Sequence, residues 1–262
     1  MTEDMVLLDK SDGVARITLN RPALRNAFDD ALIRRLREIL ADVEQDASVR
    51  AVVLSGNGAA FCAGADLSWM KRMAGHEHAE NLADAQTLAD MLAALDRLRK
   101  PTIARVHGPA FAGGVGLVAA CDMAVGTPDA RFCFTEVRIG LSPATISPFV
   151  LRAMGAQAAR RYFLSGEVFD AAEAYRLGLL SKVVAPEQLD SAIEALLQSL
   201  IAGGPQAHAR IKELVDTVSG RPVDAALAAD TARRIADIRV SPEGKEGIAS
   251  FLEKRRPAWS VR

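Results

Sequence analysis

A glycine-rich junction between a strand and a helix, residues 107–122, constrains the fold of this chain more than any other stretch. Its sequence is His-Gly-Pro-Ala-Phe-Ala-Gly-Gly-Val-Gly-Leu-Val-Ala-Ala-Cys-Asp, and it follows an apolar run, 102–106, that predicts a buried strand. Residues 115–121 predict an equally buried helix. Because Gly113 and Gly114 lack side chains, a ligand atom can approach their N–H groups at the positive end of the helix dipole. A glycine pair alone, however, is better explained by close packing of strand against helix.

A second junction of the same kind changes that interpretation. Phe-Cys-Ala-Gly-Ala-Asp-Leu, residues 61–67, follows another apolar stretch, 51–54, and again brings small residues to a turn between a strand and a helix. Two converging sets of N–H groups predict an oxyanion hole, which stabilises negative charge on a thioester or ester oxygen during acyl transfer or enolate formation. Each donor of such a site typically contributes about 10²–10³ to the rate.

Together the two motifs resemble the enoyl-CoA hydratase/isomerase (crotonase) family, and the likeness covers nearly the whole chain. The residues that carry it are Phe-x-Ala-Gly-Ala-Asp at 61–66 and Gly-x-Ala-x-x-Gly-Gly-x-x-Leu-x-x-x-Cys-Asp at 108–122. The resemblance implies an α/β fold, a crotonase-like spiral of ββα units over residues 1–200 that carries the active site. It also implies a C-terminal helical region, 201–262, through which a homotrimer or a dimer of trimers assembles.

Within the site, the resemblance assigns the oxyanion hole to the N–H groups of Ala65 and Gly113. It places Ala63, Asp66 and Leu67 among the residues that bind the acyl-CoA substrate. Coenzyme A is then part of the substrate, and no separate cofactor is implied.

Two cations are candidates for holding the phosphates of coenzyme A. Arg25 lies in a segment that resembles the family's Arg-Pro-x-x-x-Asn-Ala, and Lys254 lies in the C-terminal Phe-x-x-Lys-Arg-x-Pro-x-Trp. Cations at such positions are more often plain surface charges.

Composition excludes several other classes of protein. At 262 residues, half of them apolar, the chain should form one main domain, and 32 basic against 33 acidic residues predict neither nucleic-acid nor membrane-surface binding. No apolar run approaches the ~20 residues of a membrane span. Three cysteines without Cys-x-x-Cys spacing indicate reduced thiols, so we expect a cytoplasmic location. There is no dinucleotide fingerprint or Walker loop, and His76 and His78 lack a third ligand for a metal.

The remaining elements follow from periodicity and from turn residues. Asp12-Gly13 predicts a hairpin between strands at 6–9 and 14–19, and Asn26 is the expected cap of the first helix. The polar segment 71–80 is expected to be mobile. Short strands are predicted at 123–125 and 131–134, and further helices at 82–98, 143–155, 156–164, 170–177, 186–202, 205–218, 222–239 and 243–253.

One carboxylate has a sequence context that points to catalysis. Glu136, in Thr-Glu-Val-Arg-Ile-Gly-Leu-Ser-Pro, resembles the family glutamate that faces the substrate's Cα and Cβ, where a proton must be moved. Family hydratases carry a second glutamate, which would fall at Gly116, so this chain departs from the usual pair. A single carboxylate suffices for Δ3–Δ2 enoyl-CoA isomerisation, which is the strongest alternative activity. A family member with fewer catalytic carboxylates could also be a non-catalytic acyl-CoA binding protein.

Finer likeness favours hydration. The segments 63–70, 136–149 and 241–247 are similar to bacterial methylglutaconyl-CoA hydratases of leucine catabolism, some of which also carry glycine at the position of Gly116. The hypothesis is therefore a hydratase of branched or carboxylated enoyl-CoA thioesters, with Glu136 as the acid/base and a water held partly by backbone near Gly116. Arg138 is then the candidate partner for a second substrate carboxylate, although it could equally pair with Asp66 or point to solvent.

Overall fold

The computed structural model describes residues 4–260, in which two sheets organise the chain. The strands are β1 Val6–Ser11, β2 Val14–Leu19, β3 Ala51–Gly56, β4 Thr102–Val106, β5 Ala110–Phe111, β6 Met123–Gly126, β7 Arg131–Cys133, β8 Phe169–Asp170 and β9 Lys182–Val183. The larger sheet has the order β1-β2-β3-β4-β6-β9 and is parallel except for the β1–β2 pair. The smaller sheet has the order β5-β7-β8.

The predicted hairpin is confirmed. Asp12 and Gly13 both have positive φ, 51° and 79°, which is the backbone of the tight turn that suits two twisted antiparallel strands. The register pairs Val14 with Ser11 across the turn and Val6 with Leu19 at the far end.

Both faces of the larger sheet are buried, as expected of a parallel sheet. Alternate residues of one strand enter different cores: Val52 and Leu54 of β3 belong to the main core, whereas Ala51 and Val53 belong to a second, smaller core on the opposite face. The strands therefore carry nearly continuous apolar runs instead of an alternating pattern.

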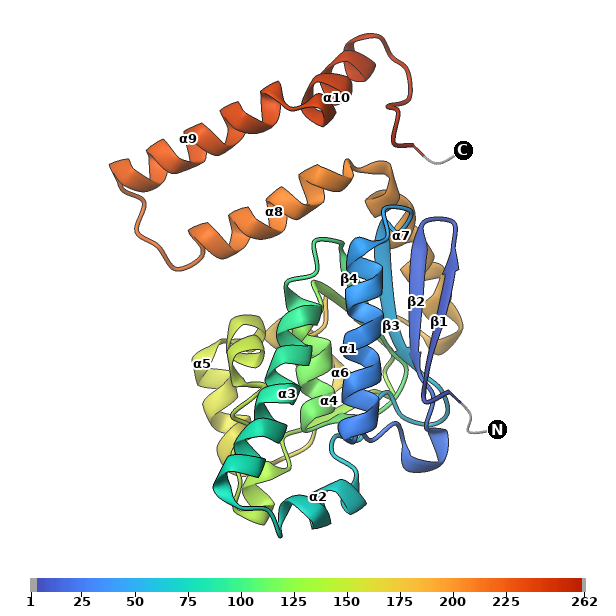
Figure 1. Ribbon diagram of the computed structural model, residues 1–262, viewed down its shortest axis with the longest axis vertical. Helices are drawn as coiled ribbons and strands as arrows, with labels where there is room; N and C mark the ends of the chain where they lie inside the picture. Colours follow the sequence, from blue (N-terminus) through green and yellow to red (C-terminus); the bar gives the residue numbers. More distant parts are fainter. Residues whose placement is uncertain (1–3, 261–262) are drawn as a thin grey trace.

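Helices cover these two faces. They are α1 Asp30–Gln45, α2 Leu67–Met73, α3 His78–Asp96, α4 Gly113–Ala120, α5 Ser147–Ser165, α6 Ala171–Leu177, α7 Leu189–Ala202, α8 Pro205–Val218, α9 Ala225–Val240 and α10 Pro242–Leu252, with short 3₁₀ turns η1 Pro22–Leu24, η2 Glu136–Ile139 and η3 Pro186–Gln188. α1, α3 and α4 pack together against the main core, and α7 supplies the helical side of the second core (Figure 1). Every residue of α4 is buried, which makes it the central helix of the molecule.

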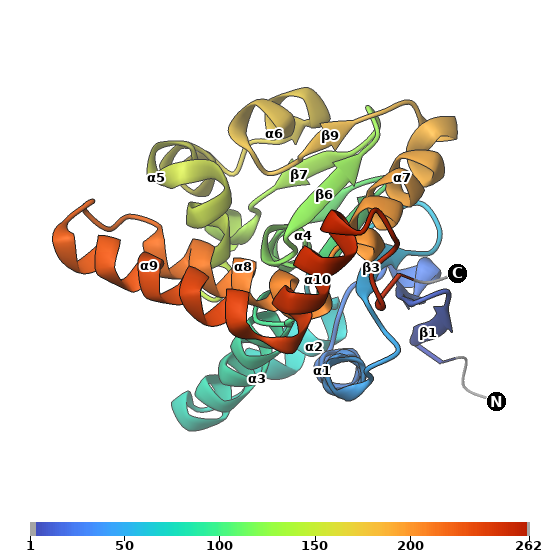
Figure 2. The same cartoon turned by 90° about the horizontal axis from the view of Figure 1, so that it is seen from above.

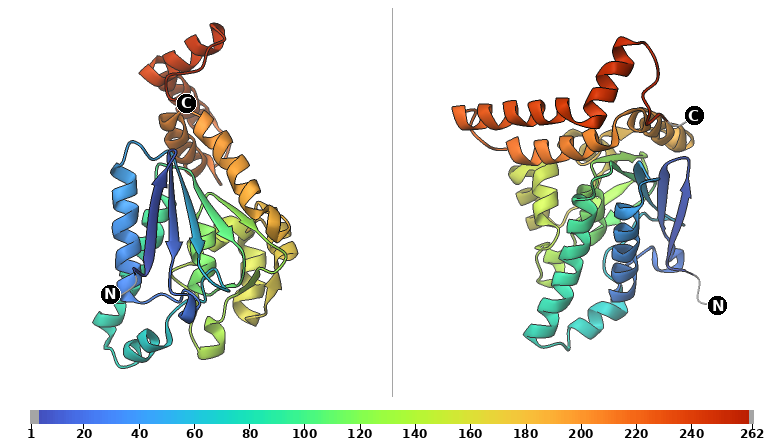
Figure 3. Two further views of the ribbon diagram at one scale, coloured as in Figure 1. Left: turned by 90° about the vertical axis from the view of Figure 1, so that its right-hand side faces the viewer. Right: turned by 45° about the horizontal axis from the view of Figure 1, so that its top comes forward.

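The C-terminal helices lie apart from the site-bearing end of the sheet. α8, α9 and α10 form a layer beyond the strands, at the end opposite α2, and α9 projects past the core (Figures 1 and 2). The same layer is seen edge-on in the right-hand view of Figure 3. The nearly buried Arg50 joins it to the sheet, because its guanidinium donates to the carbonyls of Gly203 (2.6 Å) and Trp259 (2.9 Å).

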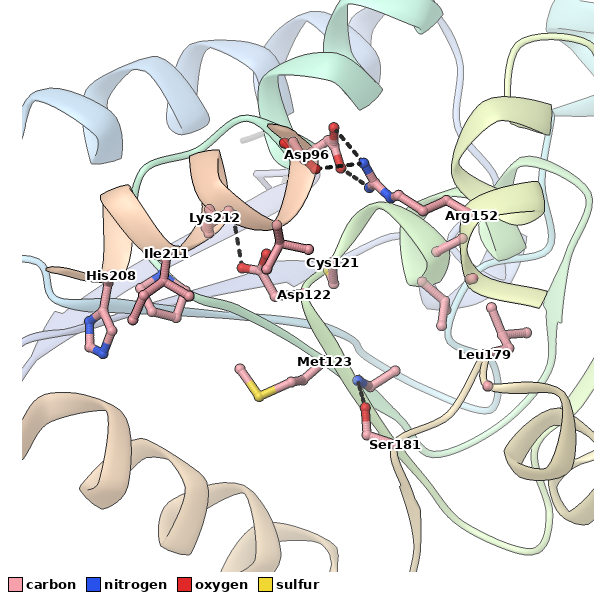
Figure 4. A pocket seen from close by; sticks show the side chains of 18 of the residues that line it. Asp96, Cys121, Asp122, Met123, Arg152, Leu179, Ser181, His208, Ile211 and Lys212 are labelled. Atoms are coloured by element: carbon pink, nitrogen blue, oxygen red, sulfur yellow. Dashed lines mark hydrogen bonds and ion pairs between the residues drawn. The ribbon is translucent and has the colours of Figure 1, made fainter. Parts of the chain in front are cut away.

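α8 also contacts the core across a cavity of about 450 Å³. Lys212 of α8 pairs with Asp122 at 2.8 Å, and Asp96 pairs with Arg152 at the other side of this cavity (Figure 4). Within residues 4–260, no helix is long and apolar enough to cross a membrane.

Three sequence-based expectations were wrong in detail. The cap of α1 is Asp29, whose carboxylate accepts from the N–H of Leu32, because Asn26 is held inside the fold. The helix expected from residue 82 begins earlier, because α3 starts at His78 with a capping box between Glu77 and Glu80; α2 ends at Met73. The segment 143–146 is not helical, so this helix begins at Ser147, whereas the predicted break at Gly155 is confirmed by its non-helical φ of 78°, which divides α5 in two.

Asn26 is instead a fully buried hub. Its side-chain oxygen accepts from the N–H of Arg21, and its amide nitrogen donates to the carbonyls of Asn57, Ala60 and Phe61 at 2.8–3.2 Å. These bonds tie the segment before α1 to the loop that follows β3.

We expect Asn26→Ala to lower the free energy of unfolding by about 2–4 kcal/mol, because it leaves several buried groups unpaired at ~1–3 kcal/mol each. Asn57→Ala is the matched control: its side chain is exposed, so we expect a change within about 0.5 kcal/mol. Urea unfolding of both variants measures the difference, and equal losses would contradict the assigned role of Asn26.

Candidate active site

The first junction places free N–H groups at the start of α4. Ala112 precedes the helix with φ 48° and ψ −121°, a conformation that L-residues rarely adopt and that costs of order 1–3 kcal/mol. The N–H groups of Val115 and Gly116 bond to the carbonyl of Ala112, whereas that of Gly113 has no acceptor within residues 4–260. The strained turn therefore points an unpaired donor out of a buried helix.

Packing explains why residues 113 and 114 are glycines. A Cβ on Gly113 would lie 2.2 Å from the Cζ of Phe28, and one on Gly114 would lie 2.3 Å from the carbonyl oxygen of Cys62. Close packing, which the sequence presented as the simpler explanation of the glycine pair, is thus confirmed at this turn.

The second junction lies directly against the first. Phe28 donates its N–H to the carbonyl of Gly64 (2.8 Å), and its own carbonyl accepts from Asp66 (3.0 Å), so Ala65 sits between two bonded neighbours. Within the described chain, no acceptor is found for the N–H of Ala65. A Cβ on Gly64 would lie 3.7 Å from the nitrogen of Gly113, which shows how close the two segments come.

Asp66 orders this loop. Its carboxylate caps α2 by accepting from Ser68 and Trp69, and it pairs with Arg21 at 3.1 Å. Burial by itself would raise the pKa of Asp66, but the two N–H donors and the charge of Arg21 hold it below its ordinary value. Asp66 is therefore ionised and structural, and it is not paired with Arg138.

Glu136 comes to the same edge through the smaller sheet. β5 and β7 pair in parallel, Phe111 opposite Cys133, and the N–H of Ala112 donates to the carbonyl of Cys133 at 2.8 Å. Gly113 and Glu136 follow these paired residues closely, so both leave the same end of the sheet. The Oε2 atom of Glu136 is buried and has no hydrogen-bond partner among residues 4–260.

Burial raises the pKa of Glu136 above its ordinary value. No cation compensates this carboxylate within the described residues. A carboxyl group whose pKa is raised by burial holds its proton more readily than a solvated one, which suits a group that exchanges protons with a bound ligand.

Arg138 is exposed and belongs to the same 3₁₀ turn, η2. One of its guanidinium nitrogens, Nη2, donates to the carbonyl of Gly166 at 2.6 Å. That bond holds the arginine across the turn and leaves most of its five N–H donors free.

Gly116 differs from what the sequence suggested. A Cβ there would lie 2.3 Å from the Cγ2 of Ile146, so the isoleucine fills the space beside this glycine. The N–H of Gly116 bonds within the helix to Ala112 at 3.4 Å. Any water near residue 116 would therefore need other partners than that N–H group.

The remaining predicted residues lie at the loop surface or far away. The N–H of Ala63 donates to the carbonyl of Arg25, whose side chain is exposed, and Leu67 is 82% exposed at the start of α2. Lys254 follows α10, at the opposite end of the molecule from α2 (Figure 1). Within a single chain, Lys254 therefore lies far from the other predicted site residues. The cavity between α8 and the core is lined by none of these residues.

Comparison with known proteins decides the family. Residues 9–262 match the family model described as enoyl-CoA hydratase/isomerase. A Thermus thermophilus protein assigned as an enoyl-CoA hydratase is 37% identical over 260 residues, which cover 97% of this chain and 100% of that protein. The chain belongs to the enoyl-CoA hydratase/isomerase family.

Solved structures agree with this membership. An enoyl-CoA hydratase from Shewanella pealeana has 40% identity and a TM-score of 0.95, covering 98% of this chain and 97% of the other. A Legionella pneumophila protein assigned as an enoyl-CoA hydratase/isomerase (crotonase) has 42% identity and a TM-score of 0.93, covering 98% and 100%. The crotonase-like α/β fold with C-terminal helices is thereby confirmed, and the chain is an enzyme of this family.

Three residues that shape the site escaped the sequence analysis. Ala112 could have been suspected because it directly precedes a glycine pair, where unusual backbone angles are common. Phe28 and Ile146 gave no signal, since each is one apolar residue among many and acts through contacts with a distant helix.

Glu136 also yields a prediction about stability. Its pKa is raised in the folded protein, so between the ordinary and the raised pKa the folded state binds more protons than the unfolded state, and stability falls as pH rises through this window. Glu136→Gln removes that titration. We expect the variant to melt at a higher temperature than the parent above the window, with the advantage disappearing in acid below the ordinary carboxyl pKa. Thermal melts across a pH series test this, and a constant difference at all pH values would contradict it.

Proposed function

We propose that this enzyme adds water across the double bond of α,β-unsaturated acyl-CoA thioesters. The observation that carries the proposal is the buried Oε2 of Glu136, which has no partner within residues 4–260 and which follows β7 at the end of the sheet where Gly113 follows β5. The N–H groups of Gly113 and of Ala65, in the adjoining loop, have no acceptor in the same part of the chain. The names of the family relatives, enoyl-CoA hydratases, support the same activity.

The reaction needs both features. The thioester oxygen accepts hydrogen bonds from Ala65 and Gly113, which stabilise the charge that builds up there when a nucleophile adds to Cβ. The oxygen of the water molecule bonds to Cβ while the carboxylate of Glu136 takes a proton from that water. The protonated Glu136 then donates a proton to Cα as the enolate collapses. One hydroxyl and one hydrogen are added, and the carboxylate is regenerated.

The acyl group is proposed to be branched or to carry a second carboxylate, of the methylglutaconyl type. A buried carboxylate needs a cation or several donors, and Arg138 is two residues from Glu136 with guanidinium N–H groups to spare. Gln or Lys at this position would offer fewer donors in a planar array.

We also propose a homotrimer or a dimer of trimers, assembled through residues 201–262. The C-terminal helices expose apolar side chains, which are costly to leave in water over a connected surface. They are Ile211, Val215, Ile235, Val240, Ile248, Phe251 and Leu252. Lys254 would then serve the CoA site of a neighbouring subunit, while Arg25 would serve that of its own.

The direct test is a panel of CoA thioesters followed by the absorbance of the conjugated enoyl group. It should include crotonyl, 3-methylcrotonyl, 3-methylglutaconyl and 3-enoyl esters, with Glu136→Gln as the inactive control. We expect the parent to bleach the conjugated esters and the variant to lose about 10²–10⁴ in turnover while still binding CoA esters, since Gln cannot exchange a proton.

Other outcomes identify the competing functions. New absorbance from 3-enoyl esters alone would make the enzyme an isomerase, an activity that the absence of a carboxylate at Gly116 favours. Unchanged spectra with every ester, together with measurable binding, would make the protein an acyl-CoA binder.

Arg138→Met tests the substrate class. It keeps much of the bulk and deletes the charge, so activity on 3-methylglutaconyl-CoA should fall by ~10²-fold or more, the scale seen when a buried polar group loses its partner, while 3-methylcrotonyl-CoA is hydrated as before. Arg176→Met is the control, because this arginine is exposed and paired with Glu173 away from the site. A parallel fall on both substrates would make Arg138 structural.

A further inference from the structure

Gly116 forms a notch in α4 that Ile146 fills. A Cβ on Gly116 would stand 2.3 Å from Cγ2 and 2.9 Å from Cβ of Ile146, and 3.7 Å from Cδ2 of Leu92. Ile146 is only 1% exposed, so its side chain is enclosed by these contacts. The Cγ2 methyl of Ile146 therefore occupies the volume that the Cβ of any residue other than glycine would need at position 116.

Ile146 is also an anchor of the segment that follows Glu136. Between η2 and α5 the backbone bonds are all short-range: Gly140 to Val137 (3.3 Å), Leu141 to Glu136 (3.0 Å), Ala144 to Ser142 (2.8 Å) and Ser147 to Ala144 (3.2 Å). Most residues from 137 to 145 are exposed, Pro143 being buried. On the N-terminal side of Glu136, Phe134 is 0% exposed and fixes the chain in the core. Buried side chains therefore bracket Glu136, Phe134 before it and Pro143 and Ile146 after it.

We propose that Ile146, seated in the Gly116 notch, is a positioning residue for Glu136. It holds the segment after η2 against α4, which keeps the carboxyl of Glu136 at the start of that helix and shielded from water. The same contact closes the place where a second carboxylate would stand, so the enzyme works with one acid/base group. This inference rests on the proposed function for its kinetic readout.

Ile146 can affect Glu136 because the position of the segment after η2 determines how deeply the Glu136 carboxyl is buried. Oε2 of Glu136 is buried without a protein partner, and burial is the cause of its raised pKa. If Ile146 no longer fills the notch, the segment can move away from α4 and water can reach the carboxyl. Both the geometry of proton transfer and the pKa of Glu136 would then change.

The kinetic test compares Ile146→Ala with Ile146→Val. Alanine removes the γ carbons that occupy the notch, so we expect kcat to fall by about 10- to 100-fold, as small misplacements of catalytic groups do, with KM changed much less. The acidic limb of the kcat/KM profile should shift to lower pH. Valine keeps Cγ2, so both kcat and the pH profile should stay close to the parent.

Ile193→Ala is the matched control. Ile193 is a buried isoleucine of α7 in the second core, on the opposite face of the sheet from α4. The Ile193→Ala variant should be less stable than the parent, but the pH profile of its kcat/KM should not shift. A comparable kcat loss and pH shift in Ile193→Ala, or a normal kcat and pH profile in Ile146→Ala, would overturn the positioning role.

A reciprocal variant covers the case in which Ile146→Ala does not fold. Gly116→Ala places a methyl 2.3 Å from Cγ2 of Ile146 and should push the isoleucine out of the notch. The double variant with Gly116→Ala and Ile146→Ala should retain more activity than the two single losses multiplied together would leave. We expect the difference to be about 2-fold or more, as for residues in contact. If Gly116→Ala folds and matches the parent in kcat and pH profile, the positioning role is overturned.

A readout without catalysis separates this inference from the proposed function. If the parent hydrates none of the thioesters, the proposed function fails, but the ¹³C titration of Glu136, identified by its loss in Glu136→Gln, still tests the contact. A lower pKa of Glu136 in Ile146→Ala or Gly116→Ala would support positioning by Ile146. An unchanged titration would overturn it.

Discussion

The site depends on how closely backbone can approach backbone at the start of α4. The ring of Phe28 lies over Gly113 and the carbonyl of Cys62 lies over Gly114, at separations that leave no space for a Cβ. This contact places the loop after β3 directly against the helix. The loop that carries Ala65 thereby lies beside Gly113, and within residues 4–260 the N–H groups of both residues are without an acceptor. Ala112 adopts a strained conformation as a consequence of the same geometry.

Glu136 is held at the cost of stability. Its Oε2 atom is buried without a hydrogen-bond partner within residues 4–260, which disfavours the ionised carboxylate, and the rest of the fold must compensate. The compensation is a large parallel sheet buried on both faces and a central helix that is entirely enclosed. Asn26 contributes in the same region, since it satisfies four backbone groups of the loops that surround the site.

The sequence predicted the elements of the fold well, and the site less completely. Strands, helices and the hairpin follow from local periodicity and turn residues, so β1, β2 and α8 were placed within a few residues. Asn26 was assigned to the wrong role because capping preference is a local signal, whereas its burial is set by residues more than thirty positions away. Gly113 was suggested by the glycine pair itself, whereas the roles of Glu136 and Ala65 could be assigned only through the family motif. Their shared location depends on the pairing of β5 with β7, two very short strands that a sequence scarcely indicates.

The glycine at 116 shows why a motif position cannot be interpreted in isolation. Gly116 has no side chain, yet the volume beside it is occupied by Ile146 from a segment thirty residues further along the chain. In this chain the glycine at 116 and the packing of Ile146 are thus one structural feature. Restoring the carboxylate by Gly116→Glu alone would overpack α4, which typically costs about 1–3 kcal/mol, before any chemistry could be gained. The space at position 116 of this chain is therefore set by two segments together, and any variant at residue 116 should be considered with residue 146 in view.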